Sequence, residues 1–253
     1  MLGFNGGLVG KERLATSAAL GCSGLWLPNE QSVAKRASKW PFGPNEVPAI
    51  GEAFGGGFFA GYISHTANGV PTHALIVAPR ATGASGTGYT LTTQYEWKPA
   101  GTATVGTTST FNGRANTDAM ITEGIALHPA AQFCTQLSIG GFTDWYLPSR
   151  LELEIAYANL KPTTDSNSTS YGINAYSVPA RASNYTAGTP PRTSVAAFQS
   201  TGAQPFVDSA HWSSTESTSA NAFYLMFNNG DQLAASKNLF NSFRVRAFRR
   251  VPV

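Results

Sequence analysis

The polar stretch 161–210 constrains the fold of this chain more than any other feature of the sequence. It is rich in Ser, Thr, Asn, Pro and Tyr and contains few aliphatic residues. Such a segment is too long for an ordinary connection between two elements and too aromatic for a simple disordered linker. Patterned segments lie on both sides of it, so the sequence predicts a domain that displays one long functional loop.

Before this loop the pattern predicts a β-hairpin followed by irregular chain. Residues 58–63 and 73–78 are typical of strands, and the Asn-Gly pair at 68–69 is a frequent hairpin turn. The stretch 82–110 is a run of Gly, Thr, Ser and Ala around Trp97, a composition typical of turns and exposed edges. We therefore expect surface loops there and no contribution to the core.

Two helices are predicted between the hairpin and the long loop. The first covers 129–137, with Pro129 in its first turn and apolar side chains at steps of three and four residues. The second begins at Ser149, which forms a capping box with Glu152, and it ends at Pro162. The apolar residues of this second helix, with Trp145 as a core residue just before it, imply that it packs on a sheet.

After the long loop the sequence predicts an antiparallel sheet. An Asn-Gly turn at 228–230 separates the second and third of its strands. The strands are expected at 206–212, 222–227, 232–235 and 243–251. Within the last of them, arginines alternate with apolar residues, which predicts a terminal strand with one polar face.

Charge and hydropathy exclude several classes of protein. Charged residues make up 12% of the chain, against about 25% in typical domains, so the surface must be largely neutral and polar. The net charge of +3 is too small and too dispersed for a phosphate backbone, so we expect no nucleic acid. No apolar stretch is long enough to span a membrane, and no secretory signal is visible, so we expect no membrane insertion and a product that starts soluble in a cytoplasm.

The sequence predicts no catalytic or metal site. The histidines, which are His65, His73, His128 and His211, are scattered and lack the spacing of zinc ligands. Cys22 and Cys134 are far apart, and a free buried pair is the default expectation, although one bridge between them stays open. We therefore expect no enzyme activity, no cofactor and no metal ion.

Residues 1–45 are expected to form a segment separate from 46–253. A short helix with Asn29 as its cap fits before Pro41. The segment resembles the amino-terminal module of phage tail-fibre and other virion proteins, in which Leu-Trp-x-x-Asn-Glu precedes a short basic helix and a Trp-Pro pair. The resemblance implies attachment to the particle through Trp26, Asn29 and Trp40; alternatively, both tryptophans cover the chain's own core.

Three motifs follow one another in 46–253, namely GGFTDWYLPS at 140–149, HWSSTE at 211–216 and FRVRAFRRV at 243–251. This ordered set resembles the C-terminal domain of collagen-like bacterial adhesins, a branch of the C-type lectin-like fold that phage tropism proteins also use. The resemblance implies an α+β fold with antiparallel sheets, two short helices, paired terminal strands and a long display loop. It implies recognition, because the related formylglycine-generating enzymes depend on a reactive cysteine pair that this chain lacks.

The chain departs from the calcium-dependent lectins of that fold. It has neither the Glu-Pro-Asn nor the Trp-Asn-Asp tripeptide that supplies calcium ligands in those proteins. Asp144, Glu216 and Asp231 offer oxygen atoms, but their spacing indicates no convergence on one ion.

The expected receptor-binding residues lie on the long loop and the terminal strands, because Tyr and Asn give recognition loops contact area and adaptable hydrogen bonds. The candidates are Tyr171, Tyr176, Asn184, Tyr185, Trp212, Asn228, Asn229, Asp231 and Asn238. Each of the loop and turn residues could equally belong to a solvated turn, and Trp212 is favoured as a core residue, with stacking on an exposed ligand as the alternative.

With these resemblances, the sequence predicts a phage virion protein, either a tail fibre or a receptor-binding protein, that recognises a host-surface glycan or protein. Its other partners would be virion proteins, and a homo-oligomer is expected, with a trimer favoured, so that many weak contacts act together. The alternatives are a capsid decoration or baseplate protein and a bacterial adhesin. An enzyme, such as a formylglycine generator or a glycan hydrolase, is the rival from another class.

Overall fold

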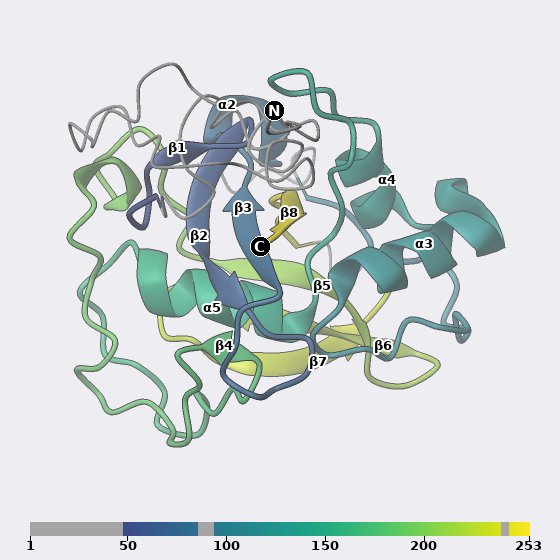
Figure 1. Cartoon of the computed structure of the whole chain (residues 1–253). Coiled ribbons are helices and arrows are strands. Elements are labelled where there is room, and N and C mark those ends of the chain that lie inside the picture. The colour runs from purple at the N-terminus through teal and green to yellow at the C-terminus, as the bar shows by residue number, and fades with distance from the viewer. Residues whose placement is uncertain (1–47, 86–93, 239–242) are drawn as a thin grey trace, which may run out of the picture.

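The first sheet contains the predicted hairpin (Figure 1). The computed structural model describes residues 48–85, 94–238 and 243–253. The strands are paired antiparallel in the order β1–β2–β3–β8, and β4 pairs with the end of β2. Their bounds are Ala53–Phe54 for β1, Gly57–Ile63 for β2, His73–Val77 for β3, Ser177–Val178 for β4 and Phe248–Pro252 for β8.

Strand β3 is buried on both faces. Leu75 and Val77 belong to one core cluster, whereas Ile76 and Ala78 belong to a second cluster on the other side of the sheet. Successive side chains of a strand point to opposite faces, so this sheet has a core on each side. A strand covered on both faces is expected to be a continuous apolar run, which is what residues 74–78 are.

The second sheet is antiparallel in the order β5–β6–β7, with bounds Ala210–Glu216, Asn221–Met226 and Gln232–Ser236. The turn predicted at 228–230 lies between β6 and β7, where Gly230 has a φ of 78°. The predicted bounds of the first strand, 206–212, are wrong at both ends, because strand β5 begins at Ala210 and ends at Glu216. Strand β5 runs through the polar HWSSTE segment because Ser213 and Thr215 are buried and donate to the carbonyl oxygens of Phe223 and Ser109.

The C-terminal segment joins the two sheets, and the prediction of one polar face on it is wrong. Only its end is strand β8, and before it Arg244 N–H donates to the carbonyl of Ala210 at the start of β5. Arg246 is 1% exposed and donates to the carbonyl oxygens of Ala78, Gln204 and Pro205. Burial lowers the pKa of Arg246 to about 9, so the guanidinium is charged at neutral pH.

Two of the longer helices are those predicted. Helix α4 covers Pro129–Thr135 and α5 covers Arg150–Leu160, whose capping box is formed in both directions. Cys134 lies fully buried on α4, and burial raises the pKa of its thiol; Cys22 lies outside the described residues. Short helical turns also form at α2, η2 and η3, which are Arg80–Gly83, Ile125–Leu127 and Ala196–Phe198.

Helix α3, Gly113–Gly124, was not predicted because Met120 is the one large apolar side chain on its buried face, beside Asn116 and Thr117. Asn116 is buried and donates to the Ser109 carbonyl at 2.7 Å and to Ser214 Oγ at 3.1 Å. An apolar repeat is therefore missing from the sequence of this helix. The local signal for it is Asn112, whose side chain caps the first turn.

Helix α5 packs between the two sheets (Figure 1). Strand β2 approaches it closely at Gly61, which has a φ of 136°. A Cβ atom there would lie 2.6 Å from Asn159 Nδ2 and 2.8 Å from Ile155 Cγ2, so no larger residue fits. Asn159 Nδ2 donates to the Ala60 carbonyl at 2.8 Å, which fixes the helix on the strand.

The expectation that 82–110 forms only surface loops is wrong. Trp97 is fully buried, and its indole N–H donates to the Ser213 carbonyl at 2.8 Å. Lys237 is also buried, lies 4.5 Å from the Trp97 ring centroid and forms an ion pair with Glu216 at 2.7 Å.

The expectation that Trp145 is a core residue is confirmed, because it is 1% exposed.

Within the residues that the structure describes, no helix is both long enough and apolar enough to cross a membrane.

Glu152 stabilises the start of α5 from a fully buried position. Its carboxylate accepts hydrogen bonds from Ser149 N–H, Gly113 N–H and Tyr146 O–H. Glu152→Ala leaves these donors without an acceptor, so the free energy of unfolding measured in urea should fall by about 3 kcal/mol. The control Asp118→Ala removes an exposed pair with Arg114 and should change it by about 0.5 kcal/mol or less; equal effects would contradict the assignment.

The histidines predict acid sensitivity. The imidazole of His211 packs against the rings of Phe206 and Phe227. Burial there lowers its pKa from 6.5 to about 3. Between pH 6.5 and about 3, the unfolded chain binds a proton at this position that the folded chain does not, so the free energy of unfolding falls as pH falls. Urea unfolding at pH 7 and pH 5 should show a smaller acid loss for His211→Gln than for the parent protein. An equal loss in both would overturn this assignment.

Candidate functional site

The long loop, residues 161–209, lies against α5 and on the side of the molecule away from α3 and α4 (Figure 1). Its regular structure is limited to the two residues of β4 and the single turn of η3. A loop of this length needs other interactions to hold its shape. Buried polar side chains of α5 and of the loop itself supply them.

The first anchor is Glu154 of α5, which is 0% exposed. Its carboxylate accepts hydrogen bonds from the guanidinium of Arg181, the hydroxyl of Tyr185 and the amide of Asn174, the last at 2.5 Å. Three parts of the loop thus converge on one charge. Hydrogen bonds to a charged acceptor are the stronger kind, and Arg181 also supplies the counter-charge.

The second anchor is Asn167 near the start of the loop. Its Oδ1 accepts hydrogen bonds from Tyr157 OH at 2.5 Å and Lys161 Nζ at 2.6 Å. Its Nδ2 donates to the carbonyl oxygens of Thr186 at 3.0 Å and Pro190 at 2.9 Å. One buried amide therefore ties the end of α5 to the far side of the loop.

Burial keeps the two phenols of these anchors protonated. It raises the pKa of Tyr157, and it raises the pKa of Tyr185 with a further contribution from the Glu154 charge. Both hydroxyls therefore remain hydrogen-bond donors at neutral pH.

Backbone hydrogen bonds hold the loop to itself and to the second sheet. Tyr185 N–H donates to the Tyr171 carbonyl at 2.7 Å, and Asn174 and Arg181 exchange both of their backbone bonds. Ser168 N–H donates to the carbonyl of Asn229 at 2.8 Å. The long loop and the turn at 228–230 therefore form one continuous surface.

Two of the expected binding residues are in the core instead. Tyr185 is 6% exposed: its hydroxyl donates a hydrogen bond to Glu154, and its ring centroid lies 5.6 Å from that of Tyr157. Trp212 is 0% exposed, and its indole N–H donates to the Tyr95 carbonyl at 2.7 Å. The expectation that Tyr185 contacts a ligand is therefore wrong; for Trp212 the favoured core position is confirmed and the alternative of ligand stacking is wrong.

The remaining candidates lie at the surface or close to it. Asn184 is exposed and Tyr171 is partly exposed, whereas Tyr176 is half-buried and stacks on Phe111 with ring centroids 4.1 Å apart. Their role in binding stays a prediction. Sequence reasoning missed Ile173, which is 58% exposed; the signal was an aliphatic residue in a polar loop.

The turn candidates are partly buried, and they are Asn228, Asn229, Asp231 and Asn238. Asn229 and Asp231 bond to each other, with Asn229 Nδ2 2.7 Å from Asp231 Oδ2. The hydrogen bond from Ser168 N–H to the Asn229 carbonyl places this pair beside the long loop. Asn238 instead follows the C-terminal end of β7. The attachment residues Trp26, Asn29 and Trp40 lie outside the described residues.

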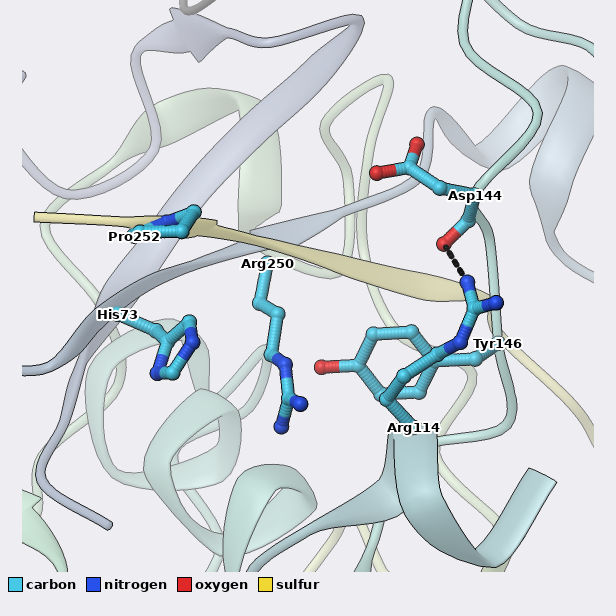
Figure 2. A pocket seen from close by; sticks show the side chains of 6 residues that line it. All are labelled: His73, Arg114, Asp144, Tyr146, Arg250 and Pro252. Carbon is cyan, nitrogen blue, oxygen red and sulfur yellow. Dashed lines mark hydrogen bonds between the residues drawn. The ribbon is translucent and has the colours of Figure 1, made fainter. Parts of the chain in front are cut away.

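A pocket of about 280 Å³ lies at the edge of the first sheet, and Figure 2 shows the side chains around it. It is lined by His73, Arg114, Asp144, Tyr146, Arg250 and Pro252. Arg250 projects from β8 between His73 and Tyr146, and Arg114 reaches in from α3. Sequence reasoning had assigned Arg250 only to the polar face of a strand.

Arg250 is held by neutral acceptors. Its Nη1 lies 2.8 Å from Asn112 Oδ1 and 3.2 Å from His65 Nε2. Across residues 48–85, 94–238 and 243–253, the ion pairs involve other basic residues and none involves Arg250. Arg249, its neighbour, is paired with Asp144.

The hairpin brings His65 and His73 together with ring centroids 4.5 Å apart. Burial, and to a smaller extent the charge of Arg250, lowers the pKa of each ring to about 4. The sequence showed these residues as scattered, although the predicted hairpin register contained the signal for their proximity. In the part of the chain that the structure describes, no group of three or more His, Cys, Asp or Glu side chains is placed to hold a metal ion.

Comparisons with known proteins assign no family. No protein-family model matches the chain, and no curated protein matches it. Among solved structures, a fimbrial protein from Bacteroides ovatus ATCC 8483 matches with 15% identity and a TM-score of 0.39. The match covers 82% of this chain and 46% of that protein, so the chain spans about half of its length. A likeness at this level assigns neither a fold nor a function.

The Glu154 anchor predicts local stability. Glu154→Ala leaves Arg181, Tyr185 and Asn174 without their common acceptor, so the loop should open more often than the core. Amide hydrogen exchange across 171–187 is expected to be about a hundredfold faster, equivalent to about 3 kcal/mol, while exchange in β3 changes little. Asn184→Ala, an exposed change in the same loop, is the control and should leave exchange as it is. Unchanged exchange in Glu154→Ala would show that the carboxylate does not hold the loop.

Proposed function

We propose that this chain is a non-catalytic recognition protein of a phage particle, a tail fibre or receptor-binding protein. Its long loop contacts a glycan or protein on the host surface. The observation that carries the proposal is the anchored loop. A buried carboxylate, a buried amide and two phenols hold this irregular loop in one shape through hydrogen bonds. The outer surface of the loop is therefore fixed.

A fixed loop supports recognition for an energetic reason. Ordering a flexible side chain on binding costs about 0.5–1.5 kcal/mol, and ordering a flexible loop costs more. Here the hydrogen bonds of Glu154 and Asn167 order the loop during folding, so binding does not have to order it. The outer side chains, Tyr171, Ile173 and Asn184, then combine a phenol, an aliphatic group and an amide, a mixture suited to an adaptable contact.

The topology supports a C-type lectin-like fold as the finer description of this α+β domain. The early strand β3 and the last strand β8 pair in one sheet, and the long loop follows the capped helix α5. The sequence order of hairpin, helix, capped helix, display loop and closing strands agrees with the resemblance found in the motifs at 140–149, 211–216 and 243–251.

Residues 1–45 serve, in this proposal, to attach the domain to other virion proteins. A trimer or another homo-oligomer then presents several copies of the loop together. Linked copies raise the effective concentration of each contact, so weak single sites give durable adhesion without a deep pocket or a metal ion.

Binding of the labelled full chain to candidate host cells tests the proposal. The display variant combines Tyr171→Ala, Ile173→Ser and Asn184→Ala, all at loop positions that are exposed or partly exposed. Truncating contact residues should weaken binding at least about tenfold. Val105→Ser is the matched control, because it removes a 92% exposed aliphatic residue elsewhere and should leave binding intact.

Binding by the display variant equal to that of the parent protein would sink the loop as a receptor site. Failed particle assembly with the same variant would favour the capsid decoration or baseplate alternative. A chelator should not change binding.

A further inference from the structure

We propose that the pocket at the edge of the first sheet binds a sugar acid, that is, a single carboxylate carried on a ring with hydroxyl groups. This site goes beyond the proposed receptor contact, because it is built from β3, α3, the residues before α5 and β8 and not from the outer surface of the long loop (Figure 2).

The donors are two guanidinium groups. Arg250 uses Nη1 for Asn112 and His65, which leaves Nε and Nη2 without a hydrogen-bond partner in the described part of the chain. Arg114 uses Nε for Asp118 and Nη1 for a long contact of 3.4 Å to the Asp144 carbonyl, visible in Figure 2. Guanidinium forks of this kind match the geometry of a carboxylate.

The acceptors point to hydroxyl groups on the ligand. Thr72 Oγ1 lies 3.1 Å from the Ile63 carbonyl oxygen and 2.9 Å from His73 Nδ1, and its one hydroxyl proton can be donated to only one of them. In either tautomer the Nε2 atom of neutral His73 is a hydrogen-bonding atom, an acceptor in one and a donor in the other, and a sugar hydroxyl can pair with both. Asp144 adds a carboxylate whose side chain is 44% exposed beside Arg249. A simple anion cannot satisfy acceptors, whereas sugar hydroxyls can donate to them.

The charge of the pocket suits one negative charge and not several. Arg114 is paired with Asp118, Asp144 is paired with Arg249, and the two histidines are neutral at pH 7. Arg250 is left as the positive group of the lining; Glu152, whose pKa is raised by burial, accepts from the Tyr146 hydroxyl and does not line the pocket. A carboxylate balances this arrangement better than a doubly charged phosphate or sulfate.

The size of the pocket limits the ligand. Its volume of about 280 Å³ lies at the lower end of the range for small-molecule sites, which begins at about 300 Å³. One sugar ring is therefore the expected occupant, held by its carboxylate against Arg250.

Titration of the full chain with sodium galacturonate, followed by NMR or calorimetry, tests the proposal. Galactose has the same ring without the carboxylate, and sodium sulfate supplies an anion without hydroxyls. Galacturonate is expected to bind, with galactose and sulfate each at least about tenfold weaker, because each satisfies only part of the pocket. Absence of galacturonate binding, or equal binding of galactose or sulfate, would overturn the proposal.

Two variants test the residues. Arg250→Gln should weaken galacturonate binding at least about tenfold. Arg114→Gln, at a side chain that is 38% exposed, should weaken it while the fold stays intact, which covers the case that Arg250→Gln unfolds. Arg192→Gln, an exposed arginine outside the pocket, is the control and should bind as the parent does. Parent-like binding by folded Arg114→Gln and Arg250→Gln would remove the ligand from this pocket.

Discussion

Two fully buried carboxylates on helix α5 determine how the rest of this domain is arranged. Glu152 and Glu154 are two positions apart, so their side chains leave the helix about 200° apart. Glu152 accepts from the start of α3 and from Tyr146, whereas Glu154 accepts from three parts of the long loop. A buried charge is costly unless donors surround it, so each carboxylate commits its neighbours to one geometry.

The same use of charge recurs across the molecule. Lys237 is buried over Trp97 and holds the segment after residue 94, and Arg246 is buried among carbonyl oxygens at the end of the long loop. In a chain with only 12% charged residues, several of those charges fix irregular segments from inside. The surface that results is neutral and polar but held in place, which is the property that our proposed recognition function needs.

Local patterns in the sequence predicted the local elements. The β2–β3 hairpin, the capped helix α5, helix α4 and the core position of Trp145 all follow from signals within a few residues. The misses share a different cause. Tyr185 and Arg246 look like surface residues until Glu154 and the carbonyls of 204–205 are brought to them from elsewhere in the chain. Polar pairing over long sequence separations leaves no periodic trace, so the candidate site was predictable as a loop but not as an anchored one.

The buried anchors should make the long loop as rigid as the sheets, and backbone ¹⁵N relaxation measures this rigidity directly. Order parameters across 161–209 should be about 0.85, the value of rigid backbone, and should match those of β2 and β3. Values below about 0.6 through the loop, with rigid sheets, would show that Glu154 and Asn167 do not hold it.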